Sequence, residues 1–157
     1  MNIKNILIVV PPIVKRKNDD IAYKYLDFET YRLITPIDAV TMASDLVRRG
    51  FKATVFDLGT FRNDGMEGLA KKLKDFRPET VVVANSILTF GSTFDQDGKD
   101  IFQTARSVLP NCITVLTGTH ATNSPGKAVL EGTCDYSIKG EPELAVGDLM
   151  QRLNWDP

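Results

Sequence analysis

The sequence predicts a three-layer α/β domain, doubly wound around a parallel sheet of five strands. Short runs of β-branched and other apolar residues alternate with longer amphipathic segments, which is the pattern of parallel strands joined by crossover helices. The run 6–10 is apolar at every position, as expected of a central strand covered on both faces. A chain of 157 residues, 43% hydrophobic and 25% charged, is long enough for one domain with its own core.

The expected strands are short and regularly spaced along the chain. They cover residues 6–10, 53–56, 81–84, 113–116 and 136–138. Because a helix separates each strand from the next, we expect right-handed crossovers. Of the two common doubly wound arrangements, the flavodoxin-like order 2-1-3-4-5 suits five strands best.

The first expected helix is the one best marked by its end residues. Thr35 is predicted as its N-cap and Pro36 as its first helical residue, and Gly50 closes it. Helical spacing then predicts an inward face made of Ile37, Val40, Ala43, Leu46 and Val47.

The other helices follow from the same signals. The second starts at 63 or 64 and stops at Arg77-Pro78, and the third covers about 95–108. A short fourth helix is predicted to begin at Ser124-Pro125, and the last begins at Pro142.

The composition indicates a cytoplasmic protein. The formal net charge is −1 and the charges are interspersed, so no basic face is expected for nucleic acid or an anionic membrane. No apolar run reaches membrane-spanning length, and the first residues lack the cleavage region of a signal peptide. Cys112 and Cys134 are expected to be buried apolar side chains rather than a disulfide or metal ligands.

Two glycine turns follow the fourth and fifth expected strands. The fourth runs into Thr117-Gly118-Thr119-His120-Ala121-Thr122, and the fifth runs into Lys139-Gly140-Glu141-Pro142. Ligands of parallel sheets bind at the carboxyl ends of the strands, where backbone N–H groups and helix beginnings converge. The two turns therefore predict a site for a cofactor or a phosphate-bearing group.

Residues 11–35 form a connection far longer than is usual between a strand and a helix. A basic and then acidic stretch, 15–20, precedes Tyr23, Tyr25, Phe28 and Tyr31. We expect a lid-like loop or a surface for a partner here.

Three common ligands of this architecture do not fit the motifs. A dinucleotide site needs G-x-G-x-x-G after the first strand, where the chain has Pro11-Pro12, and the phosphate loop of an FMN site is absent from the same place. A phosphoacceptor receiver domain would match Thr117 and Lys139. It also needs acidic residues after the first strand and an aspartate after the third, where Asn85 stands.

The remaining pattern resembles the cobalamin-binding Rossmann-like domain, and most of all the form found at the N-terminus of cobalamin-dependent radical SAM enzymes. The shared motifs span nearly the whole chain. They are Val10-Pro11-Pro12, Ser86-x-Leu88 after the third strand, Phe76-Arg77-Pro78-Glu79, Gly118-x-His120-x-Thr122, and Asp135-Tyr136 followed by Gly140-Glu141-x-Glu143.

The resemblance implies a set of cofactor-binding residues and no catalytic or metal-ligating ones. Ser86 and Leu88 would line the pocket of the nucleotide tail, Gly118 and Gly140 would admit close approach of the backbone, and the threonines would donate hydroxyl hydrogens. The full set is Pro11, Pro12, Ser86, Ile87, Leu88, Thr89, Thr117, Gly118, Thr119, His120, Ala121, Thr122, Gly140, Glu141 and Pro142.

One motif of the wider family is missing. The D-x-H-x-x-G motif, whose histidine ligates cobalt, is absent, because the chain has no histidine before His120. The resemblance therefore implies base-off, His-off cobalamin.

The resemblance also implies that residues 1–157 are one cobalamin-binding domain, the N-terminal segment of a larger enzyme. A radical SAM catalytic domain of the methyltransferase type, in cis or in trans, would hold SAM and the iron–sulfur cluster, because two cysteines do not make its motif. The domain alone would not turn over.

Two other functions stay open from the residues. The same glycine turns could bind a small nucleotide or phosphorylated metabolite in a stand-alone protein, or the domain could be a cofactor-less interaction module. His120 could ligate cobalt or donate a proton, but bonding to a cofactor amide, the phosphate or a neighbouring backbone group is favoured. Glu141 and Glu143 could be catalytic, but the dipole at a helix start explains acids there.

Overall fold

The structure, a computed structural model, describes residues 2–11, 35–58, 65–85 and 98–155. Its sheet contains β1 (Asn5–Val10), β2 (Lys52–Asp57), β3 (Thr80–Asn85), β4 (Ile113–Gly118) and β5 (Tyr136–Ser137). All neighbouring strands are parallel, in the order β2-β1-β3-β4-β5. The predicted fold class and strand order are confirmed.

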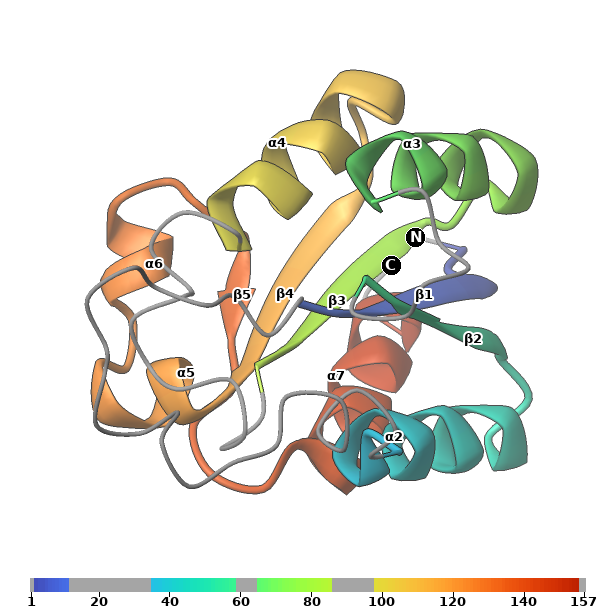
Figure 1. The fold of residues 1–157 in the computed structure, drawn as a ribbon. Helices are drawn as coiled ribbons and strands as arrows, with labels where there is room; N and C mark the ends of the chain where they lie inside the picture. The colour runs from blue at the N-terminus through green and yellow to red at the C-terminus, as the bar shows by residue number, and fades with distance from the viewer. Residues whose placement is uncertain (1, 12–34, 59–64, 86–97, 156–157) are drawn as a thin grey trace.

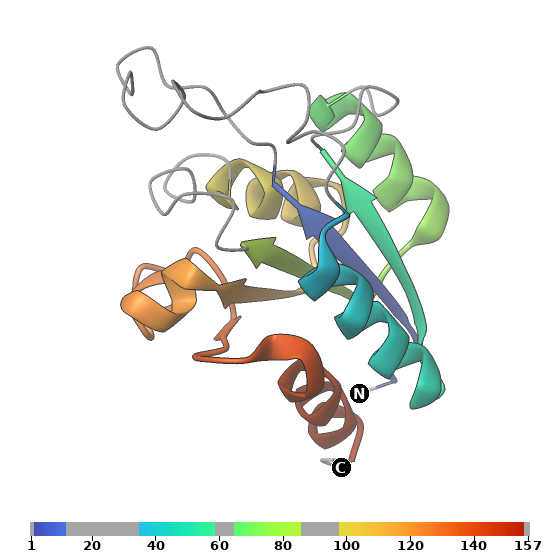
Figure 2. The same cartoon turned by 60° about the horizontal axis from the view of Figure 1, so that its bottom comes forward.

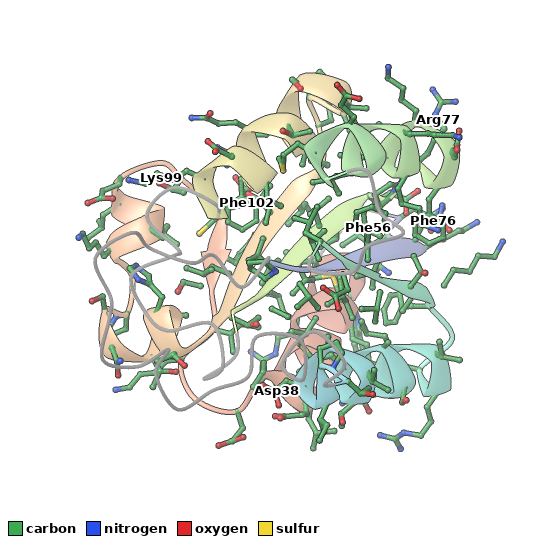
Figure 3. The ribbon with its side chains drawn as sticks, viewed as in Figure 1. Asp38, Phe56, Phe76, Arg77, Lys99 and Phe102 are labelled. Carbon is green, nitrogen blue, oxygen red and sulfur yellow. The ribbon has the colours of Figure 1, made fainter. Side chains whose placement is uncertain are left out.

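Helices cover both faces of this sheet (Figure 1). On one face α3 (Gly65–Phe76) and α4 (Lys99–Val108) bury Leu69, Leu73, Ile101 and Phe102 against the strands. Phe102, between α4 and the sheet in Figure 3, is among the largest fully buried side chains. On the other face lie α2 (Ile37–Arg48) and α7 (Pro142–Trp155), which pack against each other.

The predicted inward face of α2 is partly wrong: Leu46 is buried and Ala43 packs against the core as predicted, but the other three residues do not face inward. Ile37, Val40 and Val47 are 70%, 43% and 56% exposed, and the buried residues are Ala39, Met42, Asp45 and Leu46. The helix is rotated because one side of it packs against α7, where Arg49 links Asp45 to Asp148. It also begins one residue later than predicted: Pro36 is at the N-cap and no side chain caps the start, so Thr35 does not have the predicted role.

The end of α2 agrees with the prediction. The N–H of Gly50 donates to the carbonyl of Val47 at 3.0 Å, and the N–H of Phe51 donates to that of Leu46 at 3.0 Å. This pair of bonds is a Schellman motif, which satisfies carbonyls at the end of the helix.

The segment after β4 also differs from the prediction. Instead of one short helix beginning at Ser124-Pro125, there are two: α5 (Thr119–Asn123) and α6 (Lys127–Leu130). Ser124 and Pro125 lie in the turn between them. The first of these helices starts directly after Gly118, so residues expected in a loop are held in a helical turn.

The end of α7 lies beside the beginning of β1 (Figure 2). Asn154 accepts a hydrogen bond from the N–H of Ile3 at 2.7 Å and donates one to the carbonyl of the same residue at 2.9 Å. These two bonds join the last helix to the edge of the sheet where its strands start. Over the described residues, no helix is long and apolar enough to pass through a bilayer.

Candidate functional site

The turn after β4 depends on a glycine. Gly118 has φ 88° and ψ −153°, a conformation that residues with a Cβ rarely adopt. Before it, Thr117 is 1% exposed, and its hydroxyl donates to the carbonyl of Val83 on β3 at 3.1 Å. The Thr117 hydroxyl hydrogen is therefore used inside the sheet, and the turn projects from a fixed strand end.

The turn after β5 has the same requirement. Gly140 has φ 85°, and a Cβ built on it would meet nothing within 4 Å. Ile138 makes the last backbone bond toward β4, from its N–H to the carbonyl of Leu116 at 2.9 Å. Beyond that point, the N–H of Gly140 donates to the hydroxyl of Thr122 at 3.0 Å. The open space beside Gly140 allows close approach of a ligand.

Both turns face one cavity of about 380 Å³ at the carboxyl edge of the sheet. Its described lining comes from the ends of β3 and β4, the short helix after β4, and the beginnings of α2 and α7. These residues are Ala84, Thr117, Gly118, Thr119, Thr122, Asn123, Gly140, Glu141, Pro142, Glu143 and Asp38. Asp38 stands at the start of α2, the end of that helix nearest the start of α7 (Figure 3).

Most of the described residues from the expected site come together around this cavity. Thr117, Gly118, Thr119, Thr122, Gly140, Glu141 and Pro142 all line it. Pro11 is buried at the end of β1, and Pro12, Ser86, Ile87, Leu88 and Thr89 lie outside the described residues.

The other two expected residues, His120 and Ala121, lie on α5. Ala121 has no exposed surface and belongs to the core on the α3 and α4 face. His120 is half-buried, and its carbonyl accepts from the N–H of Ser124 at 3.0 Å. Neither is among the described lining residues.

The cavity wall is acidic. Asp38 lies in the first turn of α2 and Glu143 in the first turn of α7, where the helix dipole favours a carboxylate, and Glu141 adds a third. The described lining contains no lysine, arginine or histidine. Such a wall accepts hydrogen bonds from neutral amide or hydroxyl donors, and it disfavours a ligand with several negative charges.

Asp38 and Asn123 line the cavity but were not expected there, whereas Glu143 belongs to the motif Gly140-Glu141-x-Glu143. One signal for Asp38 was available: helices that follow parallel strands begin at the carboxyl edge, so their first-turn side chains point toward a ligand there. Asn123 has no comparable signal, because its position depends on the short helix α5.

The thiols lie away from this site. Cys112 and Cys134 are free, and both are buried in the core under α4, as predicted. Burial, with the charge of Asp135, raises the pKa of both thiols, and that of Cys134 to about 11. They are therefore protonated at neutral pH and are poor metal ligands or nucleophiles. In the described residues, no cluster of histidine, cysteine and acidic side chains is arranged to hold a metal ion.

The fold is similar to that of solved proteins, although no family model and no curated protein matches the chain. One similar structure is the radical S-adenosylmethionine methyltransferase TsrM from Kitasatospora setae with tryptophan substrate and a SAM analogue. It has a TM-score of 0.72 and 19% identity over 96% of this chain and 26% of that chain. TsrM with cobalamin and a [4Fe-4S] cluster bound gives 0.71 and 19% over 98% and 25%.

A receiver domain also matches. The CheY-like response regulator receiver domain protein from Methanospirillum hungatei has a TM-score of 0.53 and 17% identity, over 98% of this chain and 95% of that one. At these identities the likeness concerns the fold alone. The chain spans about a quarter of the length of the TsrM structures that it matches, 26% and 25%.

Proposed function

We propose that this chain is a cobalamin-binding domain that holds base-off, His-off cobalamin for a radical SAM catalytic domain, in cis or in trans. The observation that carries the proposal is that both glycine turns line one cavity, because both turns belong to the cobalamin-binding pattern in the sequence. Support also comes from the fold, which is similar to part of TsrM, a protein with cobalamin bound in one solved structure.

The cavity suits the nucleotide tail of cobalamin better than the whole cofactor. A volume of about 380 Å³ is near the lower end of ligand pockets, which hold about 300–1,000 Å³. The ribose and phosphate would lie against the backbone at Gly118 and beside Gly140, and Thr119 would donate its hydroxyl hydrogen. The corrin ring would then lie outside the cavity, across the strand ends.

The acidic wall fits this cofactor for a chemical reason. The nucleotide tail carries ribose hydroxyl groups, which are neutral hydrogen-bond donors, and it has only one phosphate. Asp38, Glu141 and Glu143 would accept from these hydroxyls. A polyphosphate nucleotide would instead bring several negative charges to three carboxylates. The wall therefore favours cobalamin over a polyphosphate nucleotide.

The role of this chain in the reaction is binding and orientation. When bound, cobalamin supplies a methyl carrier or a redox centre for radical chemistry on the catalytic domain. The chain's own residues hold the tail and present the corrin face. Ser86, Ile87, Leu88, Thr89 and Pro12 remain proposed contacts from the sequence resemblance, as do His120, Ala121 and Pro11.

The test is an anaerobic titration of the purified chain with hydroxocobalamin and methylcobalamin, followed by visible absorption. Saturable binding with base-off bands is expected. Base-on bands would keep the cofactor but reject the proposed position of the tail. Thermal stabilisation by a nucleotide, with none by either cobalamin, would favour the nucleotide-binding alternative. No shift with either ligand class would favour an interaction module.

A matched pair of glycine variants tests the position of the site. Gly140 and Gly132 have φ 85° and 69°, and a Cβ on either meets nothing within 4 Å, but only Gly140 lines the cavity. Gly140→Val and Gly132→Val should thus cost similar strain, about 1–2 kcal/mol. Only Gly140→Val should abolish cobalamin binding, and equal affinities of the two variants would contradict the site.

A further inference from the structure

The side chain of Thr122 lies between the two glycine turns. Its hydroxyl donates to the carbonyl of Gly118 at 2.9 Å and accepts from the N–H of Gly140 at 3.0 Å. Both glycines have left-handed φ; Gly118 is the last residue of β4, and Gly140 lies beyond the ladder between β4 and β5. One hydroxyl therefore connects the turn after β4 to the turn after β5.

The bond to Gly118 is local, and it uses only the hydrogen of the Thr122 hydroxyl group. Thr122 is four residues after Gly118, and a threonine on a helix readily donates to the carbonyl four residues before it. Its oxygen lone pairs remain available, and Gly140 uses one of them. Ser44 on α2 shows the local half of this arrangement alone: its hydroxyl donates to the carbonyl of Val40 at 2.9 Å.

The second turn needs such a connection because β5 is short. The strand contains only Tyr136 and Ser137, and its last backbone bond to the sheet is the one from Ile138. From there to α7 the turn has no further ladder bond in the described residues. The Thr122 hydroxyl thus fixes Gly140 relative to β4 at the point where the cavity is formed.

We infer that Thr122 is a positioning residue that holds the two glycine turns at a fixed separation and so forms the cavity before the ligand binds. The identity of the ligand rests on the proposed function; the link between the turns does not. The hydroxyl hydrogen of Thr122 is donated to the Gly118 carbonyl, and the N–H of Gly140 is donated to the Thr122 oxygen, so neither is a donor to the ligand. The ligand would bind more tightly, because the two turns are already ordered and less conformational entropy is lost on binding.

The experiment compares Thr122→Val, which keeps the shape and removes both bonds, with Thr122→Ser, which keeps the hydroxyl. Thr122→Ala is a second variant without the hydroxyl, and Ser44→Ala is the control that loses only a local bond. Two quantities are measured for each protein: amide hydrogen exchange at Gly140 without ligand, by NMR, and the Kd for hydroxocobalamin.

Thr122→Val and Thr122→Ala should each raise the Gly140 exchange rate and the Kd by about tenfold, as expected for one hydrogen bond. Thr122→Ser and Ser44→Ala should match the unsubstituted protein in both. Unchanged exchange in Thr122→Val would overturn the link. Faster exchange with an unchanged Kd would overturn the positioning role. If the unsubstituted protein binds no cobalamin, the proposed function fails, and the exchange rates still decide whether Thr122 joins the turns.

Discussion

In the described part of the chain, a cavity lies at each edge of the sheet, and the larger one is the less suited to a ligand. The carboxyl-edge cavity measures about 380 Å³. The amino-edge cavity measures about 500 Å³ and is lined in part by Lys4, Arg49 and Asn154. There Asn154 is bonded to Ile3 by both ends of its amide, and Arg49 donates to Asp45, Asp148 and Gln151. Polar groups already bonded to the protein have little to offer a ligand.

The carboxylates of the two edges differ in the same way. At the amino edge, Glu79 accepts from the N–H groups of Lys4 and Asn5 at 3.0 and 2.6 Å. Asp135 accepts from the N–H and the hydroxyl of Thr114, both at 2.7 Å, and pairs with Arg106. At the carboxyl edge, the acids line a cavity instead. The two edges therefore differ in whether their polar groups already have hydrogen-bond partners in the protein, and this difference, rather than cavity size or charge, separates a structural edge from a binding edge.

Gly147→Ala is expected to be among the substitutions that lower stability most. A Cβ there would come within 2.5 Å of Arg49 Nε and Asp45 Oδ2, which form an ion pair at the end of α2, where this helix packs against α7. We expect a loss of about 1–3 kcal/mol in the free energy of unfolding, measured with urea. Leu144→Ala, at an exposed position on the same helix, should change it by less than about 0.5 kcal/mol. A Gly147→Ala protein as stable as its parent would show that the interface yields easily.

The second prediction compares acids from the two edges. Asp135→Ala should lower the free energy of unfolding by about 1.5–3 kcal/mol, because it removes charge-assisted bonds to Thr114 and Arg106. Glu141→Ala should leave stability nearly unchanged and weaken cobalamin binding. Chemical denaturation of both variants is the measurement. The contrast between the edges is disproved if the two variants lose equal stability.

The third prediction concerns pH and Asp45. Burial alone would raise the pKa of its carboxyl, but hydrogen bonds from Arg48 and Arg49 outweigh that effect and hold the pKa below its usual range. A lowered folded-state pKa stabilises the protein above the ordinary aspartate value of about 3.9, and this stabilisation is lost as pH falls through the folded-state pKa. Asp45→Asn should therefore reduce the loss of stability on acidification below about pH 4. If the parent and the variant lose equal stability on acidification, as measured by thermal unfolding, Asp45 does not cause that loss.

The smallest expected effect is that of Glu143→Gln. The residue lies in the first turn of α7, where its charge interacts favourably with the helix dipole. Its loss should cost about 0.3–1 kcal/mol, and less at high salt. Thermal melts at low and high salt provide the measurement. A cost that is large and independent of salt would mean that this acid is as firmly bonded as those of the amino edge.

The strand order was predictable because the apolar runs and helix signals act locally and agree with one another. The buried face of α2 was not, since apolar residues occur around most of that helix and two stripes are possible. Which of the two stripes is buried depends on Asp45. This charged residue is buried only because Arg48 and Arg49 pair with it where α2 packs against α7. Such a tertiary pairing has no signal in the helix's own sequence.

The candidate site also has features that could be predicted from the sequence and features that could not. Gly118 and Gly140 were predictable, because a glycine between a strand and a helix marks a turn that other residues rarely adopt. The role of Thr122 was not, since it depends on the distance between two turns that are far apart in sequence. The contribution of Asn123 depends in turn on α5, which replaced an expected loop.

The contact between Asn154 and Ile3 has a practical consequence for experiments. Both residues lie at the amino edge, and the candidate cavity opens at the opposite edge. A biotin or chip-anchoring group attached near either of them would hold the domain with its cavity facing the solution. Binding measured on a sensor surface should then equal binding measured in free solution.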